Sequence, residues 1–194
     1  NVLGRYPFHM HLLGDAPGSY FMDNSVTNSF FRCYVVHGTH SSLLTRNVAY
    51  NAMGMCYYIE DGVEENNTLS YNFAGHIHPI YTPSGPGGGQ SGYTHSTIEG
   101  IGYAALAVPV DASASGFYIS NAWNTVIGNA ASGGWSGFAF PNIPDPIGEF
   151  YGSSTNTYAN PMYRPTKQFE GNSAHSAGFY WHDHGACVYC GAWL

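Results

Sequence analysis

The segments Asn28-Ser-Phe-Phe-Arg-Cys33, Asn51-Ala-Met-Gly-Met-Cys56 and Asn72-Phe-Ala-Gly-His-Ile77 form a repeat that decides the fold class. The asparagines lie 23 and 21 residues apart, and each is followed five residues later by cysteine or isoleucine. Short β-rich pieces such as Tyr34-Val-Val36 lie between them, without a helical periodicity. Units this short cannot bury their own apolar face, so they stack on one another. The repeat predicts an all-β fold, a parallel β-helix with coils of about 22 residues.

Asparagines at equivalent corners of such coils are expected to hydrogen-bond along the stack, and they tolerate the left-handed backbone of a corner. Asn129 and Asn172 begin a second pair of similar segments, and their offset of 43 residues is interpreted as about two periods. Residues 82–95 and 141–165 are rich in glycine and proline, which cannot continue a strand ladder. We therefore predict one domain over residues 1–194 with two projecting loops.

The composition restricts the partners of the chain. A formal net charge of −7 with only five basic residues argues against nucleic acid and against anionic lipid surfaces. No apolar run approaches the roughly 20 residues of a membrane span. The chain opens directly on its most specific motif. We therefore interpret the chain as a fragment of a longer extracellular protein. Asn66-Asn67-Thr68 is a sequon, so Asn66 is a candidate glycosylation site.

Six of the ten histidines occur in His-x-His pairs. Residues i and i+2 of a strand point to the same face, so the two imidazoles of each pair project together. Paired imidazoles are a common beginning of a metal site or an acid–base site. The pairs are His9/His11, His76/His78 and His182/His184.

Several longer motifs carry a family resemblance that covers nearly the whole chain. They are Gly4-Arg-Tyr-Pro-Phe-His-Met-His11 with Gly14-Asp15, Val36-His-Gly-Thr-His40, Tyr58-Ile-Glu-Asp-Gly62, Pro146-Ile-Gly-Glu-Phe150 and Asn172-Ser-Ala-His-Ser176. They resemble the β-helix region of cell-surface proteins with the eight-glycine domain, which include the cell-migration-inducing hyaluronidase, the transmembrane hyaluronidase and fibrocystin-like proteins. The resemblance implies a right-handed parallel β-helix in a secreted or membrane-anchored protein. Function must still be argued from a site, because one fold hosts many functions.

In-register stacking brings candidate site residues together. His37 and Glu60 each lie nine residues after a repeat asparagine, so they should be neighbours about 4.8 Å apart on adjacent coils. We predict that His37, Glu60 and Asp61 form a catalytic acid–base group. The histidines nearby could bind a divalent ion, zinc or calcium. The alternative is that they only form hydrogen bonds that stabilise the corners of the coils. The predicted metal ligands are His9, His11, His37, His76 and His78, and the predicted ligand-binding residues are Arg5, Asp15 and His40.

The cysteines allow two interpretations. Cys33 and Cys56 occupy equivalent repeat positions among apolar residues, as stacked core thiols would, and a strained disulfide is the alternative. Cys187 and Cys190 follow His182 and His184 with a spacing that could bind zinc. In a secreted protein a disulfide is the nearer explanation, either within the pair or to cysteines elsewhere.

Two functional classes follow. The chain could be an extracellular or cell-surface module whose histidine–acid flank binds, and could cleave, a polysaccharide. It could instead be a non-catalytic structural or adhesive part of a cell-surface coat or filament that contacts other surface proteins or assembles with itself. Hyaluronan carries repeating carboxylates that favour a basic groove, whereas this chain is acidic. A glycan without that charge therefore fits the chain better, and catalysis is not assigned from the sequence.

Overall fold

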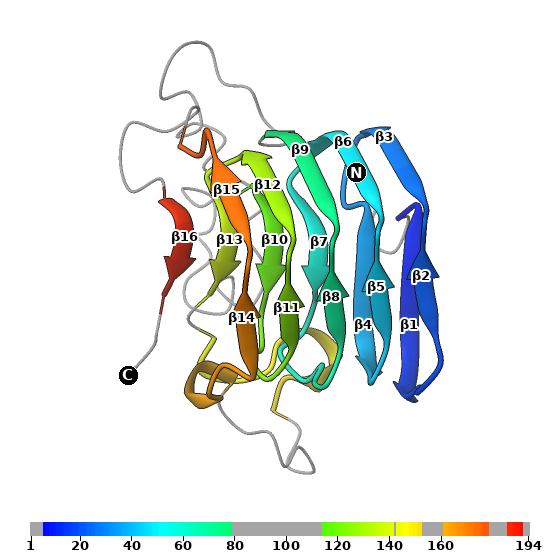
Figure 1. The fold of residues 1–194 in the computed structure, drawn as a ribbon. Coiled ribbons are helices and arrows are strands. Elements are labelled where there is room, and N and C mark those ends of the chain that lie inside the picture. The colour runs from blue at the N-terminus through cyan, green and yellow to red at the C-terminus, as the bar shows by residue number, and fades with distance from the viewer. Residues whose placement is uncertain (1–5, 79–113, 142, 153–160, 179–185, 192–194) are drawn as a thin grey trace.

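The computed structural model describes residues 6–78, 114–141, 143–152, 161–178 and 186–191, and these form three parallel sheets (Figure 1). Every pair of neighbouring strands is parallel, and successive coils add one strand to each sheet. The first sheet is β1 (Phe8–Asp15), β4 (Tyr34–His40), β7 (Met55–Ile59), β10 (Ser115–Ile119), β13 (Ser136–Phe140) and β16 (Ala186–Cys190). The second is β2 (Tyr20–Met22), β5 (Leu43–Thr45), β8 (Thr68–Ser70), β11 (Thr125–Ile127) and β14 (Gln168–Glu170). The third is β3 (Ser25–Ser29), β6 (Val48–Met53), β9 (Phe73–His78), β12 (Ala130–Gly133) and β15 (Ser173–His175).

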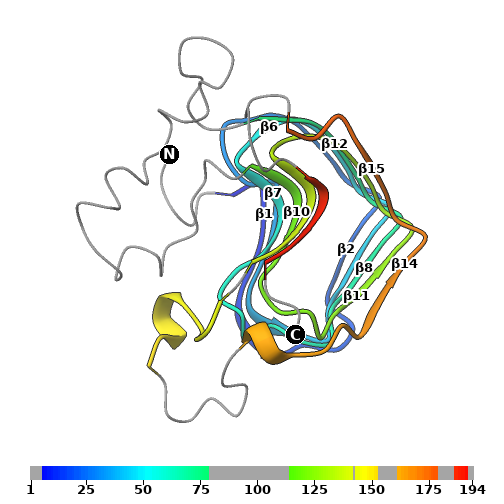
Figure 2. The same ribbon diagram turned by 90° about the vertical axis from the view of Figure 1, so that its left-hand side faces the viewer.

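The three sheets surround one apolar core, and Figure 2 shows the sheets in a view along the stack. Alternate residues of the first sheet point inward and place one aromatic ring per coil above the next, with centroids 4.5–4.9 Å apart. The stacked rings belong to Phe8, Tyr34, Tyr57, Phe117 and Phe138. The structure therefore confirms the predicted all-β fold and its parallel sheets.

A ladder of asparagine side chains runs along the corner between the second and third sheets. At each step a side-chain oxygen accepts a hydrogen bond from the backbone N–H of the asparagine on the preceding coil, at 2.9–3.1 Å. Each side-chain amide also donates to a carbonyl oxygen of a neighbouring strand, for example that of Asn72 to Leu44. The inner rungs are buried, so the ladder supplies partners to polar groups that water cannot reach. Its members are Asn24, Asn47, Asn72, Asn129 and Asn172.

The repeat alignment is right for Asn28 and Asn51 and wrong for Asn72. Asn51 donates to Asn28 at 2.7 Å, and both residues have the positive φ of a corner. The residue that continues this corner on the next coil is His76, also with a positive φ, because the register pairs Tyr50 with Gly75 and Ala52 with Ile77. Asn72 belongs to the inner ladder instead.

The later offset of 43 residues is one coil, not two. Asn129 and Asn172 hydrogen-bond directly, and β12 pairs with β15. The extra length of this coil includes residues 141–165, of which the described part contains the short 3-10 helices η3 (Gly148–Phe150) and η4 (Pro161–Tyr163). Ile143 and Ile147 are buried, so this segment folds back on the protein, and Figure 2 shows η3 beside the first sheet. The other predicted loop, 82–95, lies outside the described residues.

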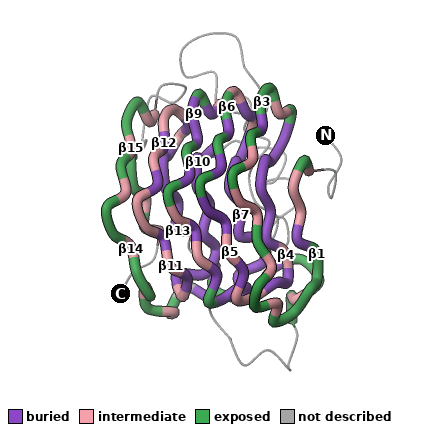
Figure 3. The backbone as a smooth tube through the Cα atoms, turned by 45° about the vertical axis from the view of Figure 1, so that its right-hand side comes forward, coloured by how far each residue is buried: buried purple, intermediate pink, exposed green. Residues whose placement is uncertain are grey.

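Exposure rises toward both ends of the described stack, as Figure 3 shows. β4 and β7 are almost wholly buried, whereas β1 and β14 expose most of their residues. Within the described ranges, no helix is long and apolar enough to cross a membrane.

The asparagine ladder generates a stability prediction. Asn72→Ala removes an acceptor for the Asn47 amide groups and a donor to the Leu44 carbonyl, all in the buried interior. Because each unsatisfied buried group costs about 1–3 kcal/mol, we expect a loss of about 3 kcal/mol in the free energy of unfolding. Urea denaturation measures it. Asn28→Gly at the exposed corner, which keeps the positive φ accessible, is the control and should cost under about 0.5 kcal/mol. Equal losses in the two variants would contradict the importance of the ladder.

Candidate functional site

The outer face of the first sheet brings the predicted histidine–acid residues together on neighbouring coils. The parallel register pairs His11 of β1 with His37 of β4. It also pairs Val36 with Ile59, and the Glu60 N–H donates to the Val36 carbonyl oxygen at 3.1 Å. His37 and Glu60 therefore occupy equivalent positions, as the repeat predicted. His9 lies two residues before His11, on the same face.

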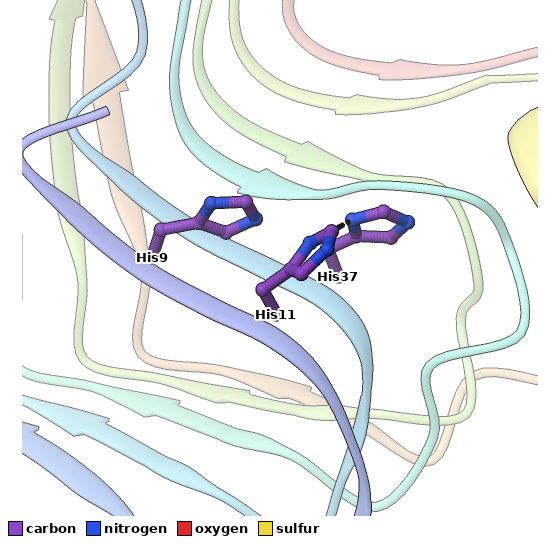
Figure 4. A group of neighbouring side chains, drawn as sticks. All are labelled: His9, His11 and His37. Atoms are coloured by element: carbon purple, nitrogen blue, oxygen red, sulfur yellow. Dashed lines mark hydrogen bonds between the residues drawn. The ribbon is translucent and has the colours of Figure 1, made fainter. Parts of the chain in front are cut away.

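Three imidazoles form a compact group, drawn in Figure 4. The Nδ1 atoms of His11 and His37 are 2.9 Å apart. The rings of His9 and His37 are nearly parallel, with centroids 5.9 Å apart, and His11 meets both rings edge-on. One nitrogen from each residue lies within 4.8 Å of the others. His11 is exposed, whereas His9 and His37 are partly buried, so the group opens to solvent through His11.

Three carboxylates surround His37. Its Nε2 atom is 2.8 Å from an oxygen of Asp61 and 2.9 Å from an oxygen of Glu149, and its Nδ1 atom is 3.9 Å from Glu60. The Asp61 side chain is 4% exposed and that of Glu149 is 47% exposed, so the imidazole connects a buried acid with an acid in contact with solvent.

A buried acid positions Asp61. The Glu64 carboxylate accepts hydrogen bonds from the backbone N–H groups of Gly38, Asp61 and Gly62, at 2.9–3.1 Å. Gly38 and Gly62 both have a positive φ, which glycine adopts without strain. Glu64 therefore holds the turn after β7 against Gly38 of β4, and Asp61 contacts His37.

The segment 148–150 lies close to Asp61 and places the exposed acid Glu149 at the site. The Ile147 N–H donates to the Asp61 carbonyl oxygen at 2.9 Å. A Cβ at Gly148 would lie 2.5 Å from an Asp61 carboxylate oxygen, so a glycine is needed here for Glu149 to reach His37. Phe150 packs edge-on against the His37 ring.

The electrostatics of the site favour positive charge at His37. Burial lowers the pKa of His37, but contact with Asp61 and the charges of Glu60, Asp61 and Glu64 outweigh it and raise the pKa to about 9. Burial raises the pKa of Glu60 to about 7, opposed by the charges of His37 and Arg32. Burial also raises the pKa of Glu64 to about 7.

Arg32 adds a second cation close enough to Glu60 to affect its pKa. It is fully buried, and its guanidinium lies 4.1 Å from the Phe31 ring centroid and 4.0 Å from that of Tyr58. Its charge lowers the pKa of Glu60. The arrangement can hold and transfer protons, bind a cation, or orient a polar ligand at an exposed face.

Other predicted site residues lie elsewhere. His76 and His78 are on β9 in the third sheet, where His76 stacks on Tyr50 and His78 contacts the Asn51 side-chain oxygen at 3.0 Å. The expectation that they join the flank of His9 and His11 is therefore wrong. The partly buried His40 accepts a hydrogen bond from the Glu65 N–H, and burial lowers its pKa.

The remaining predicted ligands are only partly described. Asp15 is exposed at the end of β1, beside His40 in register. Arg5, His182 and His184 lie outside the described residues. Asn66 is exposed, and its side-chain oxygen accepts a hydrogen bond from Lys167, so its glycosylation stays a prediction.

The cysteines are all free. Cys33 and Cys56 are buried and in contact on adjacent coils, as predicted for core thiols. Cys187 and Cys190 are exposed on β16. Because they are three residues apart on a strand, their side chains face opposite sides, so the structure does not form the predicted disulfide within this pair. A disulfide to other cysteines stays a prediction.

Sequence reasoning missed Glu149 and Glu64 as parts of the site and did not predict that Arg32 is buried. The motif Pro146-Ile-Gly-Glu-Phe150 contains Glu149 and could have pointed to it, but the motif was used only as part of the family resemblance. No spacing rule places Glu149 next to His37, because more than a hundred residues separate them. For Glu64, the signal was the Glu-Asp-Gly turn that precedes it.

The raised pKa of His37 predicts a pH-dependent stability in metal-free buffer. A histidine whose pKa is raised on folding from 6.5 to about 9 contributes stability that is complete below pH 6.5 and is lost as pH rises toward 9. We expect the free energy of unfolding, measured by urea titration with EDTA, to fall across this window. The fall should be smaller in His37→Gln and unchanged in His175→Gln, an exposed histidine on β15. An equal fall in all three proteins would contradict the assignment.

Comparison with known proteins identifies the relatives of the chain. The family model of the CEMIP β-helix matches residues 1–181. Two Dictyostelium discoideum proteins, "Communication mutant protein F" and "Protein rliB", are each 50% identical to the chain, over 98% and 100% of its length. The human "Cell surface hyaluronidase CEMIP2" is 32% identical over 90% of the chain.

The chain spans only part of these relatives. It covers 16% of each of the two Dictyostelium proteins and 13% of the human protein. The fold, the motifs and the family match agree over nearly the whole chain, and the chain belongs to the CEMIP β-helix family.

Proposed function

We propose that the outer face of the first sheet, around His37, Asp61 and Glu149, binds an extracellular polysaccharide and cleaves its glycosidic bonds. The observation that carries this proposal is the pair of carboxylates on one imidazole nitrogen, with Asp61 at 2.8 Å and Glu149 at 2.9 Å from His37 Nε2. Glycoside hydrolysis requires two acidic groups flanking the scissile bond, one to protonate the leaving oxygen and one to activate water or stabilise the sugar cation.

The burial of the acids assigns their roles. Glu149 is the carboxylate most open to solvent, so it accepts a proton from the attacking water. The His37 imidazolium, held in its charged form and oriented by buried Asp61, donates a proton to the leaving sugar oxygen. Glu64 is a positioning residue, since its carboxylate is taken up by backbone N–H groups.

The family supports the class of substrate. The human relative is named a cell surface hyaluronidase, which makes a polysaccharide at the cell surface the expected ligand. Within this chain, the net charge of −7 favours a neutral or sparsely charged glycan over hyaluronan. We also propose a cell-surface or extracellular location, and a right-handed coil, the hand that parallel crossover connections adopt.

Depolymerisation assays test this function. The chain, and the longer protein that contains it, are incubated with hyaluronan and with a neutral β-glucan, and product size is followed by gel filtration. Because general acid–base groups contribute about 10²–10⁴-fold, Glu149→Gln should lower kcat/KM by at least about 100-fold. Glu170→Gln, the same change at an exposed site on β14, should leave it unchanged.

Two results would overturn the proposal. One is full activity in Glu149→Gln and Asp61→Asn. The other is the absence of both binding and cleavage for every glycan, which would favour a structural or adhesive role.

A further inference from the structure

We propose that His9, His11 and His37 bind one zinc ion on the outer face of the first sheet (Figure 4). The three residues come from two adjacent strands, a His-x-His pair on β1 and its in-register neighbour on β4. The site lies beside the carboxylates assigned above, so it deepens the proposed function by adding a cation to the same face.

The nitrogen positions fit a shared ion. Ligand nitrogens about 2.0–2.1 Å from a tetrahedral zinc ion lie roughly 3.3 Å from one another. The Nδ1 atoms of His11 and His37 are 2.9 Å apart, and one nitrogen of each of the three residues lies within 4.8 Å of the others. Two imidazole nitrogens that face each other this closely need a proton or a cation between them. Small side-chain rotations would bring the third nitrogen into range.

The carboxylates fix the orientation of His37. Its Nε2 atom lies 2.8 Å from an oxygen of Asp61 and 2.9 Å from an oxygen of Glu149, so Nδ1, which faces His11, is the nitrogen left for a metal ion. This carboxylate–histidine arrangement is what holds and strengthens metal-bound imidazoles. The buried turn held by Glu64 fixes the position of Asp61 in turn.

The charge of the site also favours a cation. Glu60, Asp61 and Glu149 lie within 4 Å of one imidazole. Oxygen Oε2 of Glu60 is buried and has no hydrogen-bond partner among the described residues, and it lies 3.9 Å from His37 Nδ1. It is placed to accept a hydrogen bond from a water molecule on the ion, which would satisfy a polar atom that is costly to leave unpaired.

The donor set selects the metal. Three imidazole nitrogens suit zinc, whereas calcium and magnesium require six or more oxygen ligands. Three protein ligands leave the fourth tetrahedral position open, as in catalytic zinc sites. His11 is exposed, so that position is accessible to water or to an oxygen of a glycan.

Zinc binding can be measured without any glycan. The test uses the chain with Cys187→Ser and Cys190→Ser as background, because these exposed thiols could bind zinc themselves. Equilibrium dialysis with elemental analysis and calorimetry should find one zinc per chain, and millimolar calcium should not displace it. Cobalt substitution should give the intense visible absorption of a tetrahedral site.

Matched variants identify the ligands. His9→Gln and His11→Gln should each weaken zinc binding by at least about 100-fold, and Glu149→Gln by about 10-fold, as expected for an outer partner. His175→Gln should bind as the background does, because His175 lies on the third sheet and contacts Ser176. Circular dichroism confirms that each variant is folded.

The outcomes separate the two proposals. Zinc that remains bound in His9→Gln and His11→Gln, or a background chain that binds none, overturns the zinc site and leaves glycan cleavage to its own assay. Zinc binding with the expected variant pattern in a chain that cleaves no glycan supports the site and overturns the proposed cleavage.

Discussion

In-register stacking of parallel coils is the constraint on which the rest of this structure depends. Buried asparagines give each coil a fixed hydrogen-bonded position on the next, so polar backbone groups at the corner are satisfied without water. The aromatic rings of the first sheet then stack at a constant spacing. A slip of one residue would turn every inward ring outward, so both faces of each strand are specified together.

The candidate site is a consequence of this register on the outer face. Residues from three successive coils, His11, His37 and Glu60, become neighbours because their strands are neighbours. Two departures from the regular coil complete the site. The corner after β7 is two residues longer than the one after β4, and it carries Asp61 and Glu64. The insertion after β13 returns to the first sheet and adds Glu149. Regular coils supply the imidazoles and Glu60, and the two irregular segments supply Asp61, Glu64 and Glu149.

The same two departures explain where sequence reasoning failed. A longer corner shifts the third coil, so Asn72 falls on the inner ladder and His76 takes the place expected for an asparagine. The histidines of β9 lie on the third sheet rather than beside His9 because His76 follows Glu60 by only 16 residues, less than one coil. The offset between Asn129 and Asn172 was divided into two periods because the insertion makes this one coil about as long as two regular coils.

The sequence by itself determined the all-β class, the parallel stack and the neighbourhood of His9, His11, His37 and Glu60, because strand alternation and a short repeat are local properties. The family resemblance added specificity to the same conclusion. Only the tertiary structure decided that Glu149 contacts His37, that Arg32 is buried between aromatic rings, and that His76 and His78 lie apart from the site. These contacts depend on corner lengths and on an inserted segment folding back, and both are set by packing between distant parts of the chain.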